Sequence, residues 1–214
     1  MRAIFLLLLS FISSVTVCQK KVLKKITSTS TAVAISTEGL DSFTLENSDS
    51  KFLEIFLYAE NPNKQHIIVD EKNKELEIKF KIPDLKTPEA VFRKYITERL
   101  KRASATIKIP KNRNVAIFGE YVNIHSKSFK GNLRVFLENG IVKLDTIQKG
   151  LELKIYAGNV FGKIKNATIN VVSKNGKIKI DSAFYQKEYQ EINSKNFKKL
   201  TITSNKGNIY LTHL

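Results

Sequence analysis

The sequence predicts an all-β protein: a single-domain β-solenoid of stacked short strands, about 18–21 residues per coil, with one inserted short helix. Two observations lead to this fold class. Apolar and polar residues alternate along most of the chain, which is typical of strands with one buried face. In the C-terminal third this alternation recurs at a constant interval around glycines, and a constant interval indicates a repeat architecture.

The interval is set by Gly140, Gly158 and Gly176, which are 18 residues apart, and by Gly207, which follows 31 residues later. Seventeen of the twenty positions that alternate on either side of these glycines are aliphatic. Glycine tolerates the positive φ of tight turns, so each is expected where two strands turn. A local hairpin would explain one unit, whereas stacked coils also explain the constant length.

The polar positions between the aliphatic ones should form columns on the outer surface. With an 18-residue repeat, Arg134 lies over Glu152, and Asp145, Lys163 and Asp181 alternate in charge on coils about 4.8 Å apart. Exposed pairs of this kind contribute only about 0–1 kcal/mol each. These charge pairs matter mainly because they predict which residues of adjacent coils lie opposite one another.

Upstream segments alternate less regularly, and no linker marks a boundary, so one domain is expected from residue 26 to 214, with insertions at 84–103 and 183–196. The first insertion contains the expected helix, because Thr87, Pro88 and Glu89 form a helix start and apolar residues follow at helical spacing. The second carries aromatic residues without a clear period. It is expected to fold back and cover the C-terminal end of the domain.

The N-terminus predicts export. Arg2 precedes an apolar run from Ala3 to Ile12, and this run is too short to span a bilayer but suits the core of a signal peptide, assigned to residues 1–19. A lipoprotein anchored through Cys18 is the alternative to simple cleavage, although the small residue expected before such a cysteine is missing. The periplasm or the cell surface is the expected location.

Composition limits the function classes. The chain has 214 residues and a formal net charge of +16, and its single cysteine excludes a disulfide framework. Export argues against a nucleic-acid partner, so anionic envelope polymers or lipid headgroups are the expected partners, with a merely solvated basic face as the alternative. The candidate anionic-partner patch consists of Arg93, Lys94, Arg99, Lys101, Arg102, Lys108, Lys111 and Arg113.

Chemical motifs point away from catalysis. His66, His125 and His213 have no ligand spacing, and no phosphate-binding glycine loop or nucleophile motif occurs, so neither a metal nor a cofactor nor a catalytic residue is expected. Asp145 and Asp181 could form the carboxylate pair of a glycosidase, but Lys163 between them indicates a structural charge ladder instead.

The segment from Leu133 to Asp145 and the strand Ala105 to Pro110 resemble the putative-adhesin family of β-solenoid domains in bacterial envelope proteins. The resemblance covers roughly residues 28–214 and implies an exported, repetitive β-domain without a catalytic motif. The predicted helix and the segment 183–196 depart from the family's plain repeat.

Three functions follow as hypotheses. The first is a non-catalytic envelope module that adheres to or scaffolds a partner. The second is a periplasmic carrier or assembly factor for lipid or polysaccharide, which a continuous apolar groove would favour. The third is a polysaccharide-active enzyme, which a cleft with several convergent carboxylates would favour.

Export is expected to remove the first 18 or 19 residues. Intact-mass analysis of the protein recovered from the cell envelope should find a chain that starts at Gln19 or Lys20. Acyl groups on an N-terminal Cys18 would select the lipoprotein alternative, and an intact Met1 would contradict the prediction of a signal peptide.

Overall fold

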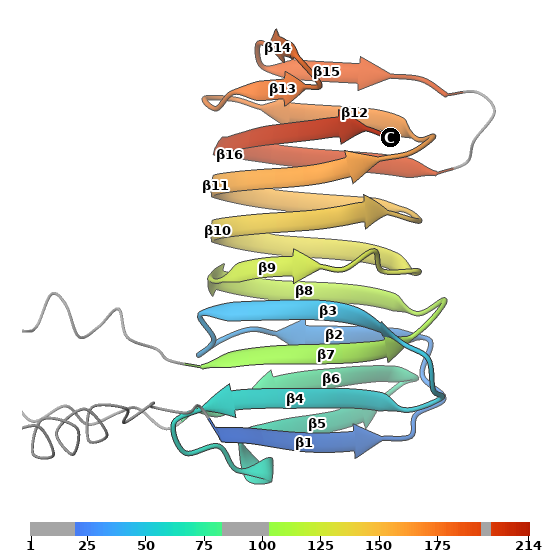
Figure 1. Cartoon of the computed structure of the whole chain (residues 1–214), viewed down its shortest axis with the longest axis vertical. Helices are drawn as coiled ribbons and strands as arrows, with labels where there is room; N and C mark the ends of the chain where they lie inside the picture. The colour runs from blue at the N-terminus through green and yellow to red at the C-terminus, as the bar shows by residue number, and fades with distance from the viewer. Residues whose placement is uncertain (1–19, 83–102, 194–197) are drawn as a thin grey trace, which may run out of the picture.

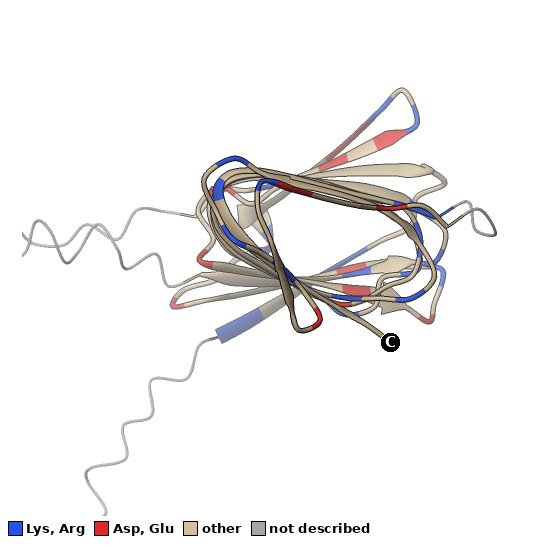
Figure 2. Cartoon of the chain, turned by 90° about the horizontal axis from the view of Figure 1, so that it is seen from above, with Lys and Arg blue, Asp and Glu red and all other residues tan. Residues whose placement is uncertain are grey.

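A computed structural model describes residues 20–82, 103–193 and 198–214. These residues form one sheet of 16 strands that winds around a single hydrophobic core (Figure 1). Seen from above, the sheet nearly closes on itself and is barrel-shaped (Figure 2). Within the described ranges the single helical element is the short 3-10 helix η1, Lys64–His66.

The strands of the N-terminal half are β1 (Lys20–Ile26), β2 (Ala32–Ser36), β3 (Ser42–Ser48), β4 (Leu53–Ala59), β5 (Ile67–Lys72), β6 (Glu75–Phe80), β7 (Ser104–Pro110), β8 (Asn114–Tyr121) and β9 (Asn123–Ser126). Those of the C-terminal half are β10 (Asn132–Ile147), β11 (Leu151–Ile164), β12 (Thr168–Ser173), β13 (Ile178–Ile180), β14 (Ala183–Tyr185), β15 (Glu188–Glu191) and β16 (Lys199–His213).

The predicted fold class, a solenoid of equal coils with an inserted helix, is wrong. The 18-residue offset holds where β10 pairs with β8, β9 and β11, but β3 pairs with β7 across a much longer interval and β1–β4, β4–β7 and β5–β6 are antiparallel. All the strands join in one barrel-shaped sheet. Alternation of apolar and polar residues predicts which face of a strand is buried. It does not predict which other strand lies beside it, because the backbone hydrogen bonds that pair strands depend little on residue type.

The order of the last strands also differs from the order of the sequence. The final strand β16 lies between β11 and the β12–β13 pair, so Ile209 is opposite Val160 on one side and Ile178 on the other (Figure 1). If the strands were stacked in sequence order, as the predicted solenoid requires, Ile178 would instead lie between Val160 and Ile209. The same stacking would place Lys163 between Asp145 and Asp181, whereas Lys163 lies opposite Thr212 of β16.

The predicted alignment of the glycines is confirmed where β10, β11 and β16 pair, with Gly140 opposite Gly158 and Gly158 opposite Gly207. Both β10 and β11 continue through the glycine as bent strands and do not end in a turn. At Gly158 a side chain is excluded, since φ is 119° and a Cβ atom would lie 2.0 Å from the carbonyl oxygen of Gly140. The Gly158 backbone can approach that of Gly140 this closely only because Gly158 has no side chain.

The outer columns follow the predicted register but not the predicted ion pair. Arg134 lies opposite Glu152 as expected. The Glu152 carboxylate, however, is 2.9 Å from the amine of Lys154 on its own strand. The predicted register is therefore confirmed, but Glu152 forms its ion pair with Lys154 on the same strand and not with Arg134.

The core consists of inward columns that run from strand to strand through the whole sheet. Val160, Ile178 and Ile209 are fully buried in one of them. Burying an isoleucine contributes about 1.5–3 kcal/mol. Because a single strand cannot bury its own apolar side chains, the side chains of neighbouring strands must pack around them.

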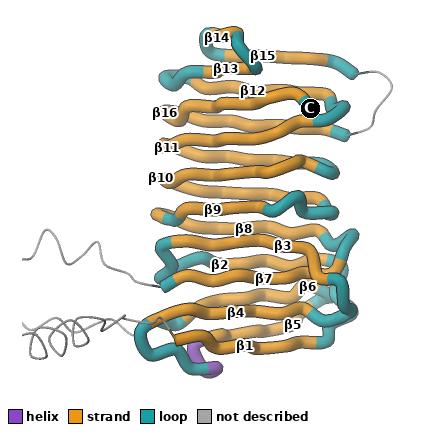
Figure 3. The backbone as a smooth tube through the Cα atoms, in the orientation of Figure 1, coloured by secondary structure: helices purple, strands orange, loops and turns teal. Residues whose placement is uncertain are grey.

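Both open edges of the sheet are protected. The described part of the segment 183–196, expected to cover the end formed by the last strand, lies instead against β12 and β13, farther out than β16: β15 pairs with β12 and β14 pairs with β13, both antiparallel. At the other end β1 is an edge strand that carries Lys20, Lys21, Lys24 and Lys25. Short or lysine-rich edges disfavour pairing with other chains. The predicted signal peptide and most of the insertion at 84–103, with its helix, lie outside the described residues (Figure 3).

Replacing Ile178 with Asp should lower the melting temperature by many degrees, whereas Lys179→Asp should change it little. The carboxylate introduced by Ile178→Asp would be buried without a partner, which costs more than the lost apolar contact. Lys179 points outward and lies 5.4 Å from the ring of Phe184. Circular dichroism melts of the two variants compare them directly, and equal losses would contradict the observed register.

Candidate functional site

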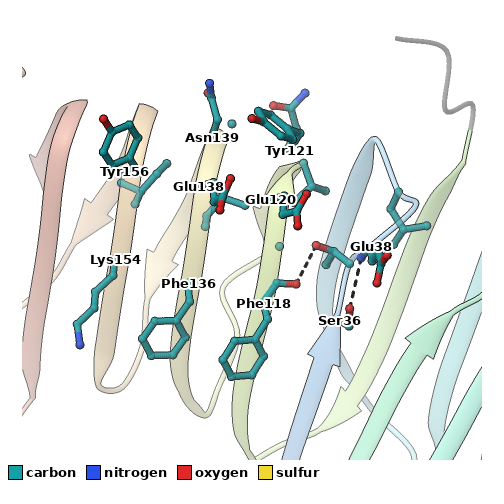
Figure 4. A pocket seen from close by; sticks show the side chains of 18 of the residues that line it. Ser36, Glu38, Phe118, Glu120, Tyr121, Phe136, Glu138, Asn139, Lys154 and Tyr156 are labelled. Atoms are coloured by element: carbon teal, nitrogen blue, oxygen red, sulfur yellow. Dashed lines mark hydrogen bonds between the residues drawn. The ribbon is translucent and has the colours of Figure 1, made fainter. Parts of the chain in front are cut away.

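A groove of about 1120 Å³ follows the side of the molecule where the long strands bend (Figure 4). Its walls come from the β2–β3 loop, the ends of β8, the bends of β10 and β11, and residues of β16. In Figure 1 these bends lie on the left, where the β2–β3 loop also turns. Strands from both halves of the chain therefore build one surface.

Two stacked phenylalanine rings form a platform in this groove. Phe118 of β8 and Phe136 of β10 are paired in register, with ring centroids 5.3 Å apart and planes 10° from parallel. Phe118 is 46% exposed, although apolar side chains of this size usually lie in the core. The amine of Lys154 lies 5.5 Å from the Phe136 ring, so a cation borders the platform.

A column of carboxylates runs beside the rings. Glu120 and Glu138 each follow two residues after a platform phenylalanine, on the same face of their strands, and Glu38 of the β2–β3 loop lies next to them (Figure 4). The loop is fixed to β8 because the Thr37 backbone N–H donates to the Phe118 carbonyl at 2.9 Å. None of the three glutamates forms an ion pair with a lysine or arginine of the described ranges, so their oxygens are open to a ligand.

The outer rim of the groove carries two tyrosines and an amide. Tyr121 is 71% exposed and Tyr156 is 52% exposed. Asn139 lies opposite Tyr121 in the register of β8 and β10. The Lys206 amine lies 5.7 Å from the Tyr156 ring. Aromatic faces, amides and carboxylates thus alternate along the rim.

The predicted basic patch is only partly described. Arg93, Lys94, Arg99, Lys101 and Arg102 lie outside the described residues. Of the others, Lys108 is 3.7 Å from Glu46, Lys111 is 3.6 Å from Asp49, and the Arg113 guanidinium donates to the Ser28 carbonyl at 3.0 Å. Lys108 lies on β7, while Lys111 and Arg113 lie in the loop after β7.

The three histidines are separated in space as they are in sequence. His66 accepts a hydrogen bond from the Asn63 backbone N–H, and His125 lies 2.8 Å from Asp145. His213, on the last strand, lies 2.8 Å from Asp181 and 3.2 Å from Glu191. Within the described ranges, no three histidine, cysteine or acidic side chains are grouped so that they could hold a metal ion.

The groove residues were not recognised in the sequence, although a signal was present. Phe118 and Phe136 are 18 residues apart, as are Glu120 and Glu138, so they share the period of the core columns. An outward column that repeats aromatic and acidic residues indicates a surface for a ligand. The position of Glu38 beside these residues could not be predicted in this way. It follows from the pairing of β2 with β8, whose separation along the chain matches no repeat in the sequence.

The described residues contain no helix long and apolar enough to cross a membrane. No family model matches the chain, and no curated protein matches it in sequence. Among solved structures the chain is similar to the crystal structure of a "putative cell adhesion protein" from Clostridium sporogenes. The TM-score is 0.63 at 14% identity, over 92% of this chain and 100% of that chain. A likeness at this identity shows a shared fold.

Two looser likenesses are to a "putative adhesin" from Parabacteroides merdae and to a "putative lipid binding protein" from Parabacteroides distasonis. The first has a TM-score of 0.38 at 14% identity over 90% of this chain and 81% of that chain. The second has a TM-score of 0.25 at 13% identity over 89% and 96%. Superpositions this loose carry no argument. The name of the Clostridium sporogenes protein agrees with the resemblance drawn from the sequence.

The contacts of His213 predict a pH dependence of stability. Its hydrogen bond with Asp181 raises the pKa of His213, and the charges of Asp181 and Glu191 add to this while burial opposes it. The hydrogen bonds from the side chain and backbone of His213 lower the pKa of Asp181. Nearby, burial followed by a hydrogen bond to Glu191 raises the pKa of Tyr189.

Because the folded pKa of His213 is raised, its stabilisation is complete below the ordinary value near 6.5 and is lost as pH rises through the folded value. That of Asp181 is present above about pH 4 and is lost as pH falls through its lowered pKa. His213→Asn should therefore lower the melting temperature more at about pH 5.5 than at about pH 8.5. In an Asp181→Asn background this pH dependence should shrink. An equal loss at both pH values would contradict it.

Proposed function

We propose that the chain is an exported, non-catalytic adhesion module of the cell envelope that binds a glycan strand along the groove. Its N-terminal sequence supports export, and its fold is shared with a structure named as a "putative cell adhesion protein". The observation that carries the proposal is the stacked pair of Phe118, which is exposed, and Phe136, which is half-buried, beside carboxylates that form no ion pair within the described ranges.

Sugar rings match such a surface chemically. Their C–H faces are apolar and pack flat against aromatic rings, while their hydroxyl groups donate hydrogen bonds to carboxylate and amide oxygens. Glu120, Glu138 and Asn139 supply these acceptors at the edge of the platform (Figure 4). Burial of the exposed Phe118 ring and of the open part of the half-buried Phe136 ring provides the affinity, and the acceptors provide orientation.

The groove is elongated because it crosses several strands. Equivalent positions on neighbouring strands are about 4.8 Å apart, so the lining repeats at that spacing from the β2–β3 loop to β16. A polymer laid across the strands meets a new ring or acceptor at each of them. This favours a glycan strand over a single sugar.

The lining also separates this function from the other hypotheses. A lipid carrier needs a continuous apolar channel, whereas here glutamates and an asparagine interrupt the aromatic rings. Glu38, Glu120 and Glu138 repel an anionic ligand, so we infer a neutral or amino-bearing glycan. The anionic partners expected for the basic residues would need another surface.

Phe118→Ala combined with Phe136→Ala should weaken glycan binding about tenfold or more, which corresponds to about 1.4 kcal/mol. The matched control is Phe161→Ala with Tyr210→Ala, which removes a second stacked pair, 5.1 Å apart and 11° from parallel, on residues outside the groove. The measurement is a glycan array screen of the mature protein, followed by calorimetry with the best neutral or amino-bearing ligand. An equal loss of glycan affinity in both double variants, or no loss in the Phe118→Ala, Phe136→Ala variant, would contradict the proposal that the groove binds the glycan.

The same ligand tests for catalysis. Glu120 and Glu138 lie on neighbouring strands, at a spacing close to the roughly 5–5.5 Å between the carboxylates of retaining glycosidases. We expect no new reducing ends after prolonged incubation with the bound glycan. Release of reducing ends that Glu120→Gln abolishes would replace the adhesion proposal with that of a polysaccharide-active enzyme.

A further inference from the structure

A second hollow, of about 600 Å³, lies where the loops at the ends of the long strands gather, on the side opposite the bends. Loops after β10 and β11 and the residue before β16 form it. These loops lie on the right in Figures 1 and 3, while the groove residues lie at the bends on the left. Among the described residues, its lining contains Lys149, Lys165 and Lys198, together with asparagine and glutamine side chains, and no carboxylate.

Backbone and side-chain contacts connect these loops with the loops of earlier strands. The Asn112 backbone N–H donates to the Lys130 carbonyl at 3.0 Å, and the Lys149 amine donates to the Asn112 side-chain oxygen at 2.8 Å. Farther along, the Lys198 amine donates to the Lys165 carbonyl at 2.7 Å. Basic residues therefore follow one another along this side of the sheet, from the loop after β7 to the start of β16. We call this row, Lys111, Arg113, Lys130, Lys149, Lys165 and Lys198, the basic ridge.

Most of this charge is not neutralised by neighbouring carboxylates. Lys130, Lys149 and Lys165 are exposed and form no ion pair with a carboxylate of the described ranges. The Lys149 amine donates to the neutral side-chain oxygen of Asn112. Burial lowers the pKa of Lys198, so an anion placed against it would stabilise its charged form.

We propose that the basic ridge binds a linear polyanion whose phosphate or carboxylate groups repeat along the polymer. The lysines follow the loops from strand to strand, so their charges form a line and match a line of anions better than one ion. A single exposed lysine contributes little in water, and several engaged at once on one polymer raise the avidity. This site is separate from the proposed glycan groove and uses none of its residues.

The ridge also extends the expectation drawn from the sequence. Lys111 and Arg113 belong both to the predicted anionic-partner patch and to the ridge. The other ridge residues come from loops far along the chain, and only the pairing of β8, β10, β11 and β16 brings them into line. A lysine-rich composition alone would not distinguish this line from a general basic surface.

The test uses the full mature chain and two polymer probes, long-chain inorganic polyphosphate and polygalacturonate. The ridge variant carries Lys149→Gln, Lys165→Gln and Lys198→Gln, and the control carries Lys64→Gln, Lys143→Gln and Lys179→Gln, which remove the same charge elsewhere. We expect the ridge variant to bind at least one polymer about tenfold more weakly and the control to bind like the parent. Binding of the parent should weaken as salt rises. Thermal melts establish that both variants are folded.

Equal weakening of the two triple variants would mean that net charge alone attracts the polymer, and would overturn the proposal. Inorganic phosphate that binds as tightly as polyphosphate would overturn it in favour of a single-ion site. Tight binding to phosphatidylglycerol vesicles without binding to either polymer would overturn it in favour of a membrane surface. Phe118→Ala with Phe136→Ala should leave polymer binding unchanged, so the groove and the ridge can fail independently.

Discussion

The structure depends on the spacing and register with which backbone hydrogen bonds join neighbouring strands. At about 4.8 Å, equivalent positions on successive strands form columns, and alternate columns point into the core or out to solvent. Between β8 and β10, Val135 lies opposite Ile117 in the core, and Phe136 lies opposite Phe118 on the outer side, by the same set of hydrogen bonds. A slip of one residue would expose every core column and bury every outward one. Core, groove and ridge are therefore fixed together.

The position of β16 shows how this constraint shapes the end of the domain. The chain first forms β12 and β13 one position farther out, then β14 and β15, and only then returns to place β16 against β11. Ile209 is thereby buried from both sides, and the outermost strands are the short β14 and β15. Glu188 and Glu191 at one edge and the lysines of β1 at the other make both edges poor templates for further strands.

The side of the molecule that carries the strand bends and the opposite side, which carries the loops, differ in chemistry. One side carries the bends, where Phe118, Phe136 and three unpaired glutamates line the larger groove. The other carries the loops, where Lys149, Lys165 and Lys198 surround the smaller hollow. A net charge of +16 describes neither side, because ligands respond to the local potential. The proposed glycan and the proposed polyanion would therefore bind on opposite sides of the molecule, at sites that share no residue.

The sequence by itself determined which side of each regular strand is buried. Residues from Leu133 to Asp145 alternate so clearly that their inward positions, and the register of Gly140 against Gly158, follow from the 18-residue period. This holds because hydrophobic burial acts on individual side chains and so leaves a local, periodic mark. The same 18-residue period relates Phe118 to Phe136, so the sequence also contained the information needed to predict this part of the groove.

Only the tertiary structure decided which strands are neighbours. The placement of β16 between β11 and β12, the pairing of β2 with β8 that brings Glu38 to the groove, and the antiparallel strands of the N-terminal half left no periodic mark. Backbone hydrogen bonds are chemically alike at every residue, so the choice among possible partners rests on how the whole set of strands closes around one core. The line of basic loops exists only as a result of that choice.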